Sequence, residues 1–467
     1  MADPLDFYSL DNLRFILNTE FECVLASRDA VREAISDYYG EITGLDAMIG
    51  ELGGEEVGIR DGDLEVAGLE AGDDAPVIKL VNLIITEAVK KRASDIHIEP
   101  FENRLRVRYR IDGICVEQDA PPKRLQGPII SRIKIMAKMD MAEKRKPQDG
   151  RIKMMIQGRE IDFRVSSLPA RHGESVVLRV LDREKALVDL EDLGFHHSDL
   201  ERFERIIRRP NGIVLVTGPT GSGKTTTLYA ALKKLNRPDV KIITAENPVE
   251  YNITGINQAQ VNHKIGYDFA RILRAMLRQA PNIILVGEIR DEETANIAIQ
   301  AALTGHLVFS TLHTNDAPST IGRLIDMGVK PFLAASAILA IMAQRLVRRL
   351  CEVCKEPIDP PLSLMRAVGL SEEELGGRQI YGAVGCEECL GTGYRGRVGC
   401  YELMEMTPEL RDAVFHNATT HRIRELAISS GGMTTLQRDG VRKVLDGVTT
   451  IEEVLRITHR QDLVLTS

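Results

Sequence analysis

The chain has 467 residues, of which 43% are hydrophobic and 27% are charged, a composition typical of globular proteins. This length predicts about two to four domains, with enough apolar residues to bury a substantial core. The formal net charge of -8 and the pI near 5.8 argue against a general binder of polyanions such as nucleic acid. An acidic total can still contain a local basic channel.

No stretch of the sequence predicts insertion into a membrane. The longest charge-free apolar stretch, Pro331 to Ala343, is too short to span a bilayer. The acidic start Met1–Pro4 lacks the basic and apolar regions of a signal peptide. We therefore expect a cytoplasmic protein without a transmembrane segment.

Residues 1–68 predict a small α/β unit. A helical pattern of apolar residues is followed by a short strand at Phe21–Leu25 and a second helix after Ser27. The stretch Gly40–Asp74 is rich in Gly, Asp and Glu, and we place a flexible linker at its end, in residues 69–76.

Residues 77–183 predict an α+β domain. An amphipathic helix runs from Pro76 to about Arg92, because apolar residues recur there at helical spacing. The charged segment Asp182–Asp192 lacks a complete strand pattern and predicts a second linker, which we count as residues 184–194. The strands predicted between them are Asp95–Glu99, Arg104–Ile111, Arg151–Ile156, Glu160–Val165 and Val176–Leu181.

The second of these strands places four arginines on one face and apolar residues on the other. Such a row of charged residues, called the arginine comb below, is typical of a solvated sheet face. The alternative is a surface that meets an acidic or phosphate-bearing neighbour. The arginines are Arg104, Arg106, Arg108 and Arg110.

The segment Gly218–Thr225 fits the phosphate-binding pattern G-x-x-x-x-G-K-[ST] and follows the apolar strand Gly212–Thr217. A strand, a glycine loop and a helix in this order favour a true site over a chance match. Lys224 supplies a positive charge, and the Thr225 hydroxyl can ligate Mg²⁺. The predicted ATP or GTP site consists of Gly218, Pro219, Thr220, Gly221, Ser222, Gly223, Lys224, Thr225 and Thr226.

Three later strands each lead to a polar residue suited to nucleotide hydrolysis, and the carboxyl ends of parallel strands meet at one edge of a sheet. A carboxylate there, at Glu246 or Glu288, can hold Mg²⁺-bound water or orient the attacking water. An imidazole, at His306 or His313, can donate a hydrogen bond to the γ-phosphate. The strands are Val240–Thr244, Ile283–Val286 and Leu307–Leu312.

Each of these polar residues alone is weak evidence. A glutamate after a strand is more often a helix N-cap or a surface charge, and a single histidine is more often structural. Four strand ends with phosphate-compatible residues in one segment favour a joint role in hydrolysis.

Four of the seven cysteines form two C-x-x-C pairs, Cys351 with Cys354 and Cys386 with Cys389. Two such pairs in a cytosolic protein predict a tetrahedral zinc site, because four thiolates satisfy Zn²⁺ and disulfides are disfavoured in the cytosol. The alternative is a thioredoxin-like redox pair, but neither pair opens a strand-to-helix redox unit. The isolated cysteines are Cys23, Cys115 and Cys400.

Several longer motifs resemble those of the secretion ATPase superfamily. Ala93–Pro100 and Pro147–Arg151 resemble its pilus-assembly and type II secretion branch. The match runs from about residue 70 to the C-terminus. The segments that look like its Asp-box, Walker B and His-box are Glu246–Tyr251, Val286–Asp291, and Leu303–His306 with Ser310–Asn315.

The resemblance implies an α/β fold in which a RecA-like P-loop ATPase domain, residues 195–467, follows a PAS-like α+β domain and the short N-terminal unit. It places a structural tetracysteine zinc subdomain at residues 345–402, protruding toward a membrane platform. It implies a cytoplasmic homohexamer that hydrolyses ATP and works with an inner-membrane platform protein. The expected product is the type IV pilus, and the alternative is the pseudopilus of a type II secretion system.

Arginines that stabilise charge on the γ-phosphoryl group can be worth about 10³–10⁵ in rate. The family places nucleotide-facing arginines on its PAS-like domain, at positions that match Arg164 and Arg179. Arg274 and Arg278 lie at i and i+4 on the helix predicted before Pro281 and form a second candidate pair. The alternative for all four is an ordinary salt-bridged surface arginine.

The chain departs from the family pattern at two places. Asn247 stands where the acidic box usually has Asp, so a metal-binding role for this position is in doubt. The N-terminal unit resembles only the later part of the family's N-terminal domain, which suits either a naturally short form or a truncation.

Two functions of other classes remain open. A nucleic-acid motor can use the same RecA-like core, but the acidic pI, the absence of Trp and the 4% aromatic content disfavour it. A nucleotide-dependent scaffold without turnover is disfavoured by Glu288.

Overall fold

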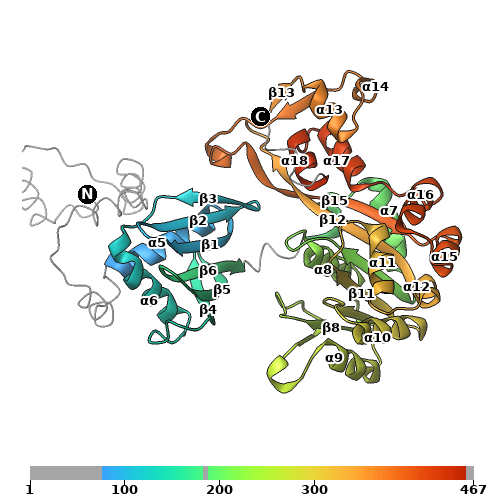
Figure 1. The fold of residues 1–467 in the computed structure, drawn as a ribbon, viewed down its shortest axis with the longest axis horizontal. Coiled ribbons are helices and arrows are strands. Elements are labelled where there is room, and N and C mark those ends of the chain that lie inside the picture. The colour runs from blue at the N-terminus through green and yellow to red at the C-terminus, as the bar shows by residue number, and fades with distance from the viewer. Residues whose placement is uncertain (1–75, 182–187, 459–467) are drawn as a thin grey trace, which may run out of the picture. The chain divides into compact units, whose positions relative to one another are not determined.

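The computed structural model describes residues 76–181 and 188–458 and divides the chain into two compact units at Val180 and Leu181 (Figure 1). The predicted α/β unit 1–68, with its strand Phe21–Leu25, lies outside the described residues, as does the linker 69–76 except for its last residue.

The first unit is an α+β domain built on a six-stranded sheet of order β3-β2-β1-β6-β5-β4. β1 pairs antiparallel with β2 and β6, and β4 pairs antiparallel with β5. Apolar residues of two helices pack with the strands into one core. The elements are α5 (Pro76–Lys90), β1 (Ala93–Pro100), β2 (Leu105–Ile111), β3 (Ile114–Gln118), η1 (Lys123–Leu125), α6 (Gln126–Met136), β4 (Gln148–Ile156), β5 (Arg159–Ala170) and β6 (Gly173–Leu181).

The predicted helix and all five predicted strands of this unit are confirmed, with ends that differ by up to five residues. β3 was not predicted. Asp112 and Gly113 have φ of 47° and 90° and form the two-residue turn between β2 and β3. An Asp-Gly pair between two alternating runs is a hairpin signal, so the sequence contained the information for this strand.

The arginine comb on β2 is paired within the sheet. Arg106 and Arg108 both bind Glu99 of β1, at 3.0 and 2.8 Å. The outer arginines bind Glu117 and Asp95: the pairs are Arg104–Glu117 at 2.9 Å and Arg110–Asp95 at 3.3 Å. These carboxylates of β1 and β3 offset the row of positive charge, as expected of a solvated sheet face.

The second unit is built on a seven-stranded sheet of order β15-β12-β7-β11-β10-β8-β9. All neighbours from β12 to β9 run parallel, and β15 is antiparallel to β12. The strands are β7 (Gly212–Thr217), β8 (Ile242–Glu246), β9 (Asn257–Gln260), β10 (Ile283–Val286), β11 (Leu307–Leu312), β12 (Ile338–Leu350) and β15 (Tyr394–Glu405). The helices and 3-10 turns around the sheet are η2 (Leu190–Leu193), α7 (His197–Ile207), α8 (Lys224–Leu235), η3 (His263–Ile265), α9 (Phe269–Met276), η4 (Leu277–Gln279), α10 (Glu292–Leu303), α11 (Ala317–Asp326), α12 (Pro331–Ala337), α15 (Pro408–Phe415) and α16 (Thr420–Ser429).

The strands β7, β10 and β11 are buried on both faces, which explains their continuous apolar runs. In β7, Val214 and Val216 face a core with α7 and α8, whereas Ile213 and Leu215 face a second core with α9, α10 and α11. The glycine loop therefore follows a strand that is packed on both faces.

The tetracysteine element extends from the ends of β12 and β15 and has a small core of its own (Figure 1). Met365, Val368 and Ile380 pack there against two C-terminal helices. The predicted zinc subdomain, residues 345–402, therefore shares its core with helices outside that range. Its elements are β13 (Glu356–Ile358), α13 (Leu362–Val368), α14 (Glu372–Leu375), β14 (Ile380–Gly382), η5 (Glu387–Cys389), α17 (Leu436–Leu445) and α18 (Ile451–Thr458).

Two local expectations, the bounds of β8 and the extent of the second linker, differ from the structure. β8 begins two residues later than the predicted Val240–Thr244 and includes Glu246 as its last residue. The apolar stretch 331–343 forms α12 and the start of β12. Residues 190–193, within the predicted second linker, form η2, whose Leu190 is buried in the core of the second unit. Within the described residues no helix is both long and apolar enough to cross a bilayer.

Candidate functional site

The glycine loop joins β7 to α8 and contains backbone that only glycine adopts easily. Gly218 has φ of 147° and Gly223 has φ of 90°. A Cβ on Gly218 would lie 2.5 Å from the carbonyl oxygen of Gln344 and 2.6 Å from Oγ of Ser222. The Ser222 hydroxyl is buried without a hydrogen-bond partner. A close-fitting loop with an unsatisfied polar atom suits a polar ligand such as phosphate.

Lys224 is the first residue of α8, so its charge lies at the positive end of that helix. Its Nζ donates to the carbonyl oxygens of Gly218 at 2.6 Å and Pro219 at 3.1 Å. Burial lowers the pKa of Lys224 to about 8, although the Glu288 carboxylate acts in the opposite direction. An anion bound in the loop would restore the charged form of this lysine.

Glu288 and His313 converge on the same edge of the sheet. Glu288 follows β10 and His313 follows β11; β11 lies beside β7 in the sheet, and β10 lies beside β11. Oε2 of Glu288 lies 3.4 Å from Nε2 of His313, and Oε1 of Glu288 lies 2.7 Å from Nη2 of Arg290. The Glu288 side chain is only 14% exposed. A carboxylate and an imidazole in contact beside a phosphate-binding loop can orient a water molecule for attack.

Hydroxyl groups hold these strand ends in register. Ser310 donates to the carbonyl oxygen of Val286 at 2.7 Å, and Thr311 donates to that of Gly287 at 2.6 Å. The Thr314 N–H donates to Oγ1 of Thr217, the last residue before the loop, at 2.8 Å. These bonds fix the residues next to Glu288 and His313 relative to the loop.

Glu246 is buried in a hydrogen-bond network of its own. Its carboxylate accepts hydrogen bonds from Thr244 at 2.5 Å, from Gln258 at 3.0 Å and from the Tyr229 hydroxyl. Tyr229 belongs to α8, so this network ties the end of β8 to the helix that follows the glycine loop. The position of Glu246 suits a role in holding the loop in place better than a role in direct contact with the reacting atoms.

His306 lies at the other edge of the sheet from the glycine loop. It precedes β11, a strand of six residues that runs parallel to β7. A strand of this length separates its two ends by about 20 Å. Nδ1 of His306 lies 2.9 Å from the carbonyl oxygen of Ala301 in the last turn of α10. The structure therefore does not bring His306 to the loop of its own chain, in contrast to His313.

Arg274 and Arg278 do not lie on one continuous α-helix. α9 ends at Met276, and Arg278 belongs to the 3-10 turn η4. Arg274 pairs with Glu293 of α10, and Nη1 of Arg278 donates to the carbonyl oxygen of Arg274 at 3.0 Å. Both side chains thus have structural partners within their own unit.

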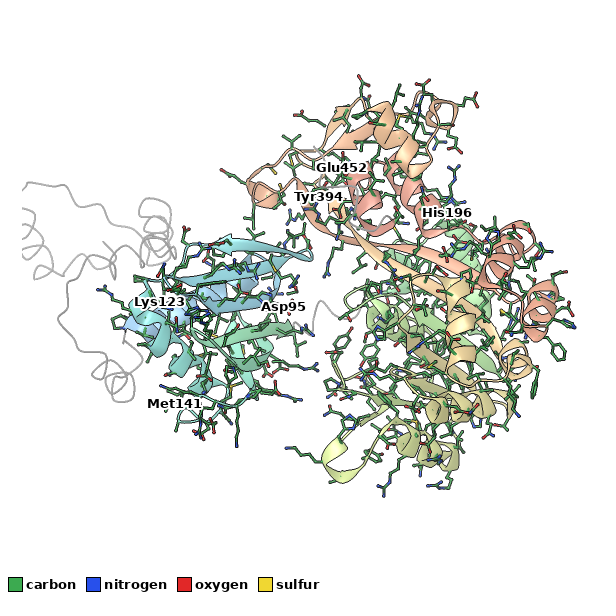
Figure 2. All side chains as sticks on the ribbon, in the orientation of Figure 1. Asp95, Lys123, Met141, His196, Tyr394 and Glu452 are labelled. Carbon is green, nitrogen blue, oxygen red and sulfur yellow. The ribbon has the colours of Figure 1, made fainter. Side chains whose placement is uncertain are left out.

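Arg164 and Arg179 belong to β5 and β6 of the first unit. Arg179 binds the carboxylate of Asp95 at 3.0 Å, and Asp95 is labelled in Figure 2. The Arg179 side chain is 58% exposed. Asp95 is only 8% exposed and also pairs with Arg110 at 3.3 Å, so it keeps a cationic partner if Arg179 turns to another anion.

Two residues beside the loop were missed by the sequence reasoning. Gln344 and Arg345 belong to β12, which runs parallel to β7. The Gln344 side chain accepts a hydrogen bond from Thr227 of α8 at 2.9 Å. β12 was not predicted as a strand, because its apolar first half was considered only as a possible membrane span. A polar Gln-Arg pair directly after that apolar run was the available signal.

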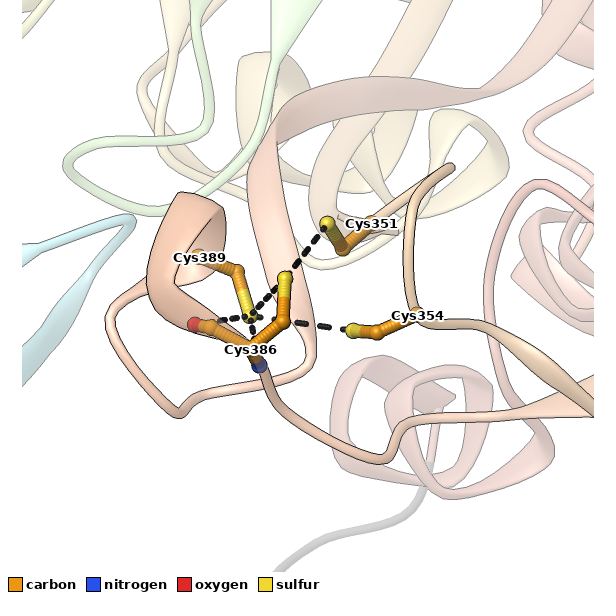
Figure 3. A group of neighbouring side chains, drawn as sticks. All are labelled: Cys351, Cys354, Cys386 and Cys389. Carbon is orange, nitrogen blue, oxygen red and sulfur yellow. Dashed lines mark hydrogen bonds between the residues drawn. The ribbon is translucent and has the colours of Figure 1, made fainter.

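The four predicted cysteines come together in one cluster (Figure 3). All four sulfur atoms lie within 4.8 Å of one another. The closest pairs are Cys351–Cys386 at 3.8 Å, Cys354–Cys389 at 3.8 Å and Cys386–Cys389 at 3.7 Å. Sulfurs bound to a tetrahedral Zn²⁺ at about 2.3 Å lie about 3.8 Å apart, so the cluster fits this metal.

Backbone N–H groups stabilise thiolates in this cluster. Gly385 donates to Sγ of Cys354 at 3.3 Å, and Cys386 and Gly393 donate to Sγ of Cys389 at 3.1 and 3.2 Å. Burial raises the pKa of Cys389, but these hydrogen bonds outweigh burial and lower the pKa to about 6. Burial raises the pKa of Cys354 to about 12, so of these two thiols Cys389 is the one that readily offers a thiolate to a metal.

Comparison with known proteins finds relatives over almost the whole chain. The family described as Type II/IV secretion system protein matches residues 70–456, and the MshEN domain family matches residues 1–45. The type IV pilus assembly ATPase PilB of Myxococcus xanthus is 50% identical over 460 residues, which cover 97% of this chain and 81% of the relative. Type II secretion system protein E of Xanthomonas campestris is also 50% identical, over 98% of this chain and 80% of the relative.

A solved structure supports the same fold. The crystal structure of the pilus retraction motor PilT with bound ADP matches 81% of this chain and 96% of that chain. The two are 26% identical and superpose with a TM-score of 0.55. Together with the sequence relatives, this match supports ATPase activity for the present chain.

Proposed function

This chain belongs to the Type II/IV secretion system protein family, and from that premise we propose that it hydrolyses ATP to drive the assembly of type IV pili. The observation that carries the proposal is the convergence of Lys224, Glu288 and His313 beside the glycine loop. Type II secretion is the second candidate, because a relative with that name is equally identical to this chain.

Each residue of the site has a distinct role in this proposal. The N–H groups of the loop and Lys224 bind the β- and γ-phosphates, and the exposed Thr225 hydroxyl serves as a ligand for Mg²⁺. Mg²⁺, when bound, would neutralise charge between the two phosphates. Glu288 accepts a proton from the attacking water, and His313 donates a hydrogen bond to the γ-phosphate. Glu246 positions the loop through Tyr229.

Membership of the family supports a proposal for the wider assembly. We propose a cytoplasmic homohexamer that works on an inner-membrane platform protein. In this proposal Zn²⁺ is held by Cys351, Cys354, Cys386 and Cys389 and has a structural role, because all four positions of a tetrahedral metal are filled by protein. No nucleic-acid partner is expected.

Two substitutions separate nucleotide binding from hydrolysis. Lys224→Ala should weaken ATP binding by at least about tenfold, because the lysine supports the phosphates in the ground state. Glu288→Gln should bind ATP as the parent does and lose at least about 99% of turnover, because it removes the base that serves the water. Equilibrium binding of a fluorescent ATP analogue and phosphate release measure the two effects.

The matched control is Glu373→Gln, an exposed glutamate of α14, which should change neither quantity. Parental turnover in Glu288→Gln would show that Glu288 is not the base. Stimulation of turnover by single-stranded DNA would favour a nucleic-acid motor, and binding without any turnover in the parent protein would favour a scaffold.

A further inference from the structure

The strand beside the glycine loop carries an arginine that the proposed function does not use. β12 pairs with β7 in parallel up to Ala343 opposite Thr217, so the next residues of β12 run alongside the loop that starts at Gly218. Nη1 of Arg345 lies 3.1 Å from the position that a Cβ on Gly218 would occupy. Arg345 is thus in contact with the start of the loop, although it lies far along the chain.

The guanidinium of Arg345 is held by neutral oxygens. Nη2 donates to the backbone oxygen of Asn315 at 2.9 Å and to its side-chain oxygen at 3.3 Å. Nη1 donates to the backbone oxygen of Gln344 at 3.1 Å. Among the residues that the structure describes, no carboxylate lies within ion-pair distance of Arg345. Asn315 comes two residues after His313, so Arg345 is anchored at the catalytic edge of the sheet.

The carboxylates that act on Arg345 from farther away are bound to other groups. Asp316 pairs with Arg424 at 2.8 Å. Glu402 is buried and accepts hydrogen bonds from the N–H groups of Ala317 at 2.9 Å and Leu436 at 3.2 Å. Both carboxylates raise the pKa of Arg345 from a distance, but neither forms an ion pair with it.

Other arginines of β12 differ in this respect. Arg348 binds Glu453 at 2.8 Å, and Arg349 lies 3.5 Å from Glu352. The unmatched charge is therefore specific to the residue that touches the loop.

Two partly buried cations, Lys224 and Arg345, meet at one loop. Burial lowers the pKa of both, and the Arg345 charge lowers the pKa of Lys224 further. Partly buried positive charges without carboxylate partners are costly, and a polyphosphate bound between them would offset that cost.

We propose that Arg345 binds the phosphate chain of the nucleotide from the side of β12, as a cation that the chain supplies to its own loop. The planar guanidinium can contact two phosphate oxygens at once, whereas Lys224 acts as a point charge. Asn315 keeps the guanidinium in place before the nucleotide arrives. This inference rests on the proposed function.

The test is the affinity of Arg345→Gln for ADP, measured with a fluorescent ADP analogue, together with the Tm of the ligand-free protein. We expect the Kd to rise by at least about tenfold, because a charge-assisted contact to phosphate is lost. The ligand-free Tm should not fall, because the substitution removes an unmatched charge. Arg345→Lys keeps the charge and should recover part of the affinity. The matched control, Arg349→Gln on the same strand, should leave the Kd unchanged.

An unchanged Kd in Arg345→Gln would overturn the inference. A raised Kd accompanied by a lower ligand-free Tm would also overturn it, because Arg345 would then only shape the loop. Lys224→Ala in the same assay separates a failure of the proposed function from a failure of this inference. If Lys224→Ala binds ADP with the parent Kd, the proposed function fails. If Lys224→Ala binds ADP more weakly but Arg345→Gln keeps the parent Kd, this inference alone fails.

Discussion

The glycine loop and the tetracysteine cluster are held in different ways. The loop extends from a strand buried on both faces, between two large apolar cores. The cysteines lie on turns next to short strands, above a small core that includes Met365 and Ile380. The packing of the protein thus determines the geometry of the loop, whereas the geometry of the cluster depends on what binds the four sulfurs.

This difference separates two kinds of ligand dependence. A site built from strand ends in a large core is formed before its ligand binds, so removing the ligand should leave the fold intact. A small element that lacks an adequate core draws part of its folding free energy from its metal. The two sites should therefore respond differently to substitution.

The largest effect is expected from removing two cysteine ligands. Cys386→Ser combined with Cys389→Ser should abolish a metal content of about one zinc per chain. Structural zinc sites contribute about 10–16 kcal/mol in small domains, so the element around residues 351–392 should unfold locally. Metal analysis and limited proteolysis measure the two effects.

The nucleotide loop should be spared in the same double variant, with the Kd for ADP within about twofold of the parent value. Cys115→Ser, which changes a cysteine outside the cluster, is the matched control and should keep the zinc. Absence of zinc from the parent protein would refute the zinc site. Loss of ADP binding in the double variant would show that the glycine loop depends on the tetracysteine cluster.

The next prediction tests whether the nucleotide site, whose loop is formed within the second unit, needs arginines of the first unit for full activity. Arg164→Ala or Arg179→Ala should lower kcat by at least about tenfold, a loss of about 1.4 kcal/mol in transition-state stabilisation. Negative charge develops on the γ-phosphoryl oxygens during hydrolysis, and neither Lys224 nor the N-terminal end of α8 moves to stabilise it. Steady-state turnover of assembled hexamers at saturating ATP measures the effect.

Arg104→Ala is the control for this pair, because Arg104 directly precedes β2 of the same unit and binds Glu117 in an exposed ion pair. Zinc content and hexamer formation should be unchanged in all three variants. Parental kcat in both Arg164→Ala and Arg179→Ala would limit the catalytic machinery to the second unit.

The sequence predicted most of what depends on local pattern. The resemblance to secretion ATPases and the α/β fold class are confirmed, as are the bounds of β7, β10 and β11. These strands are continuous apolar runs followed by motifs, so neither their extent nor their order depends on distant contacts. The cysteine cluster was also predicted, because the two pairs are close in sequence and have one common chemistry.

The sequence could not predict what depends on long-range pairing. Arg345 reaches the loop only because β12 pairs with β7, and spacing along the chain does not reveal that pairing. His306 and His313 occur in one motif, but the strand between them carries them to opposite edges of the sheet. Glu246 follows a predicted strand as expected, yet its bonds to Tyr229 and Gln258 depend on α8 and β9. The roles of all these residues stay predictions.

The smallest effect concerns the protonation of Lys224 in the preformed loop. Because burial lowers the pKa of this lysine to about 8, raising the pH through 8 should remove the charge that binds phosphate. Bound nucleotide favours the charged form, so binding takes up a proton above this pH and the affinity falls as the pH rises. Between pH 7.5 and 8.5 the Kd for ADP should increase about threefold, the change expected for one group with a pKa near 8. In Lys224→Arg, whose charge persists throughout this range, the Kd should be independent of pH even if the affinity itself is lower. Titration of a fluorescent ADP analogue across this range measures both slopes, and a parent Kd that does not change with pH would mean that Lys224 keeps its charge without a ligand.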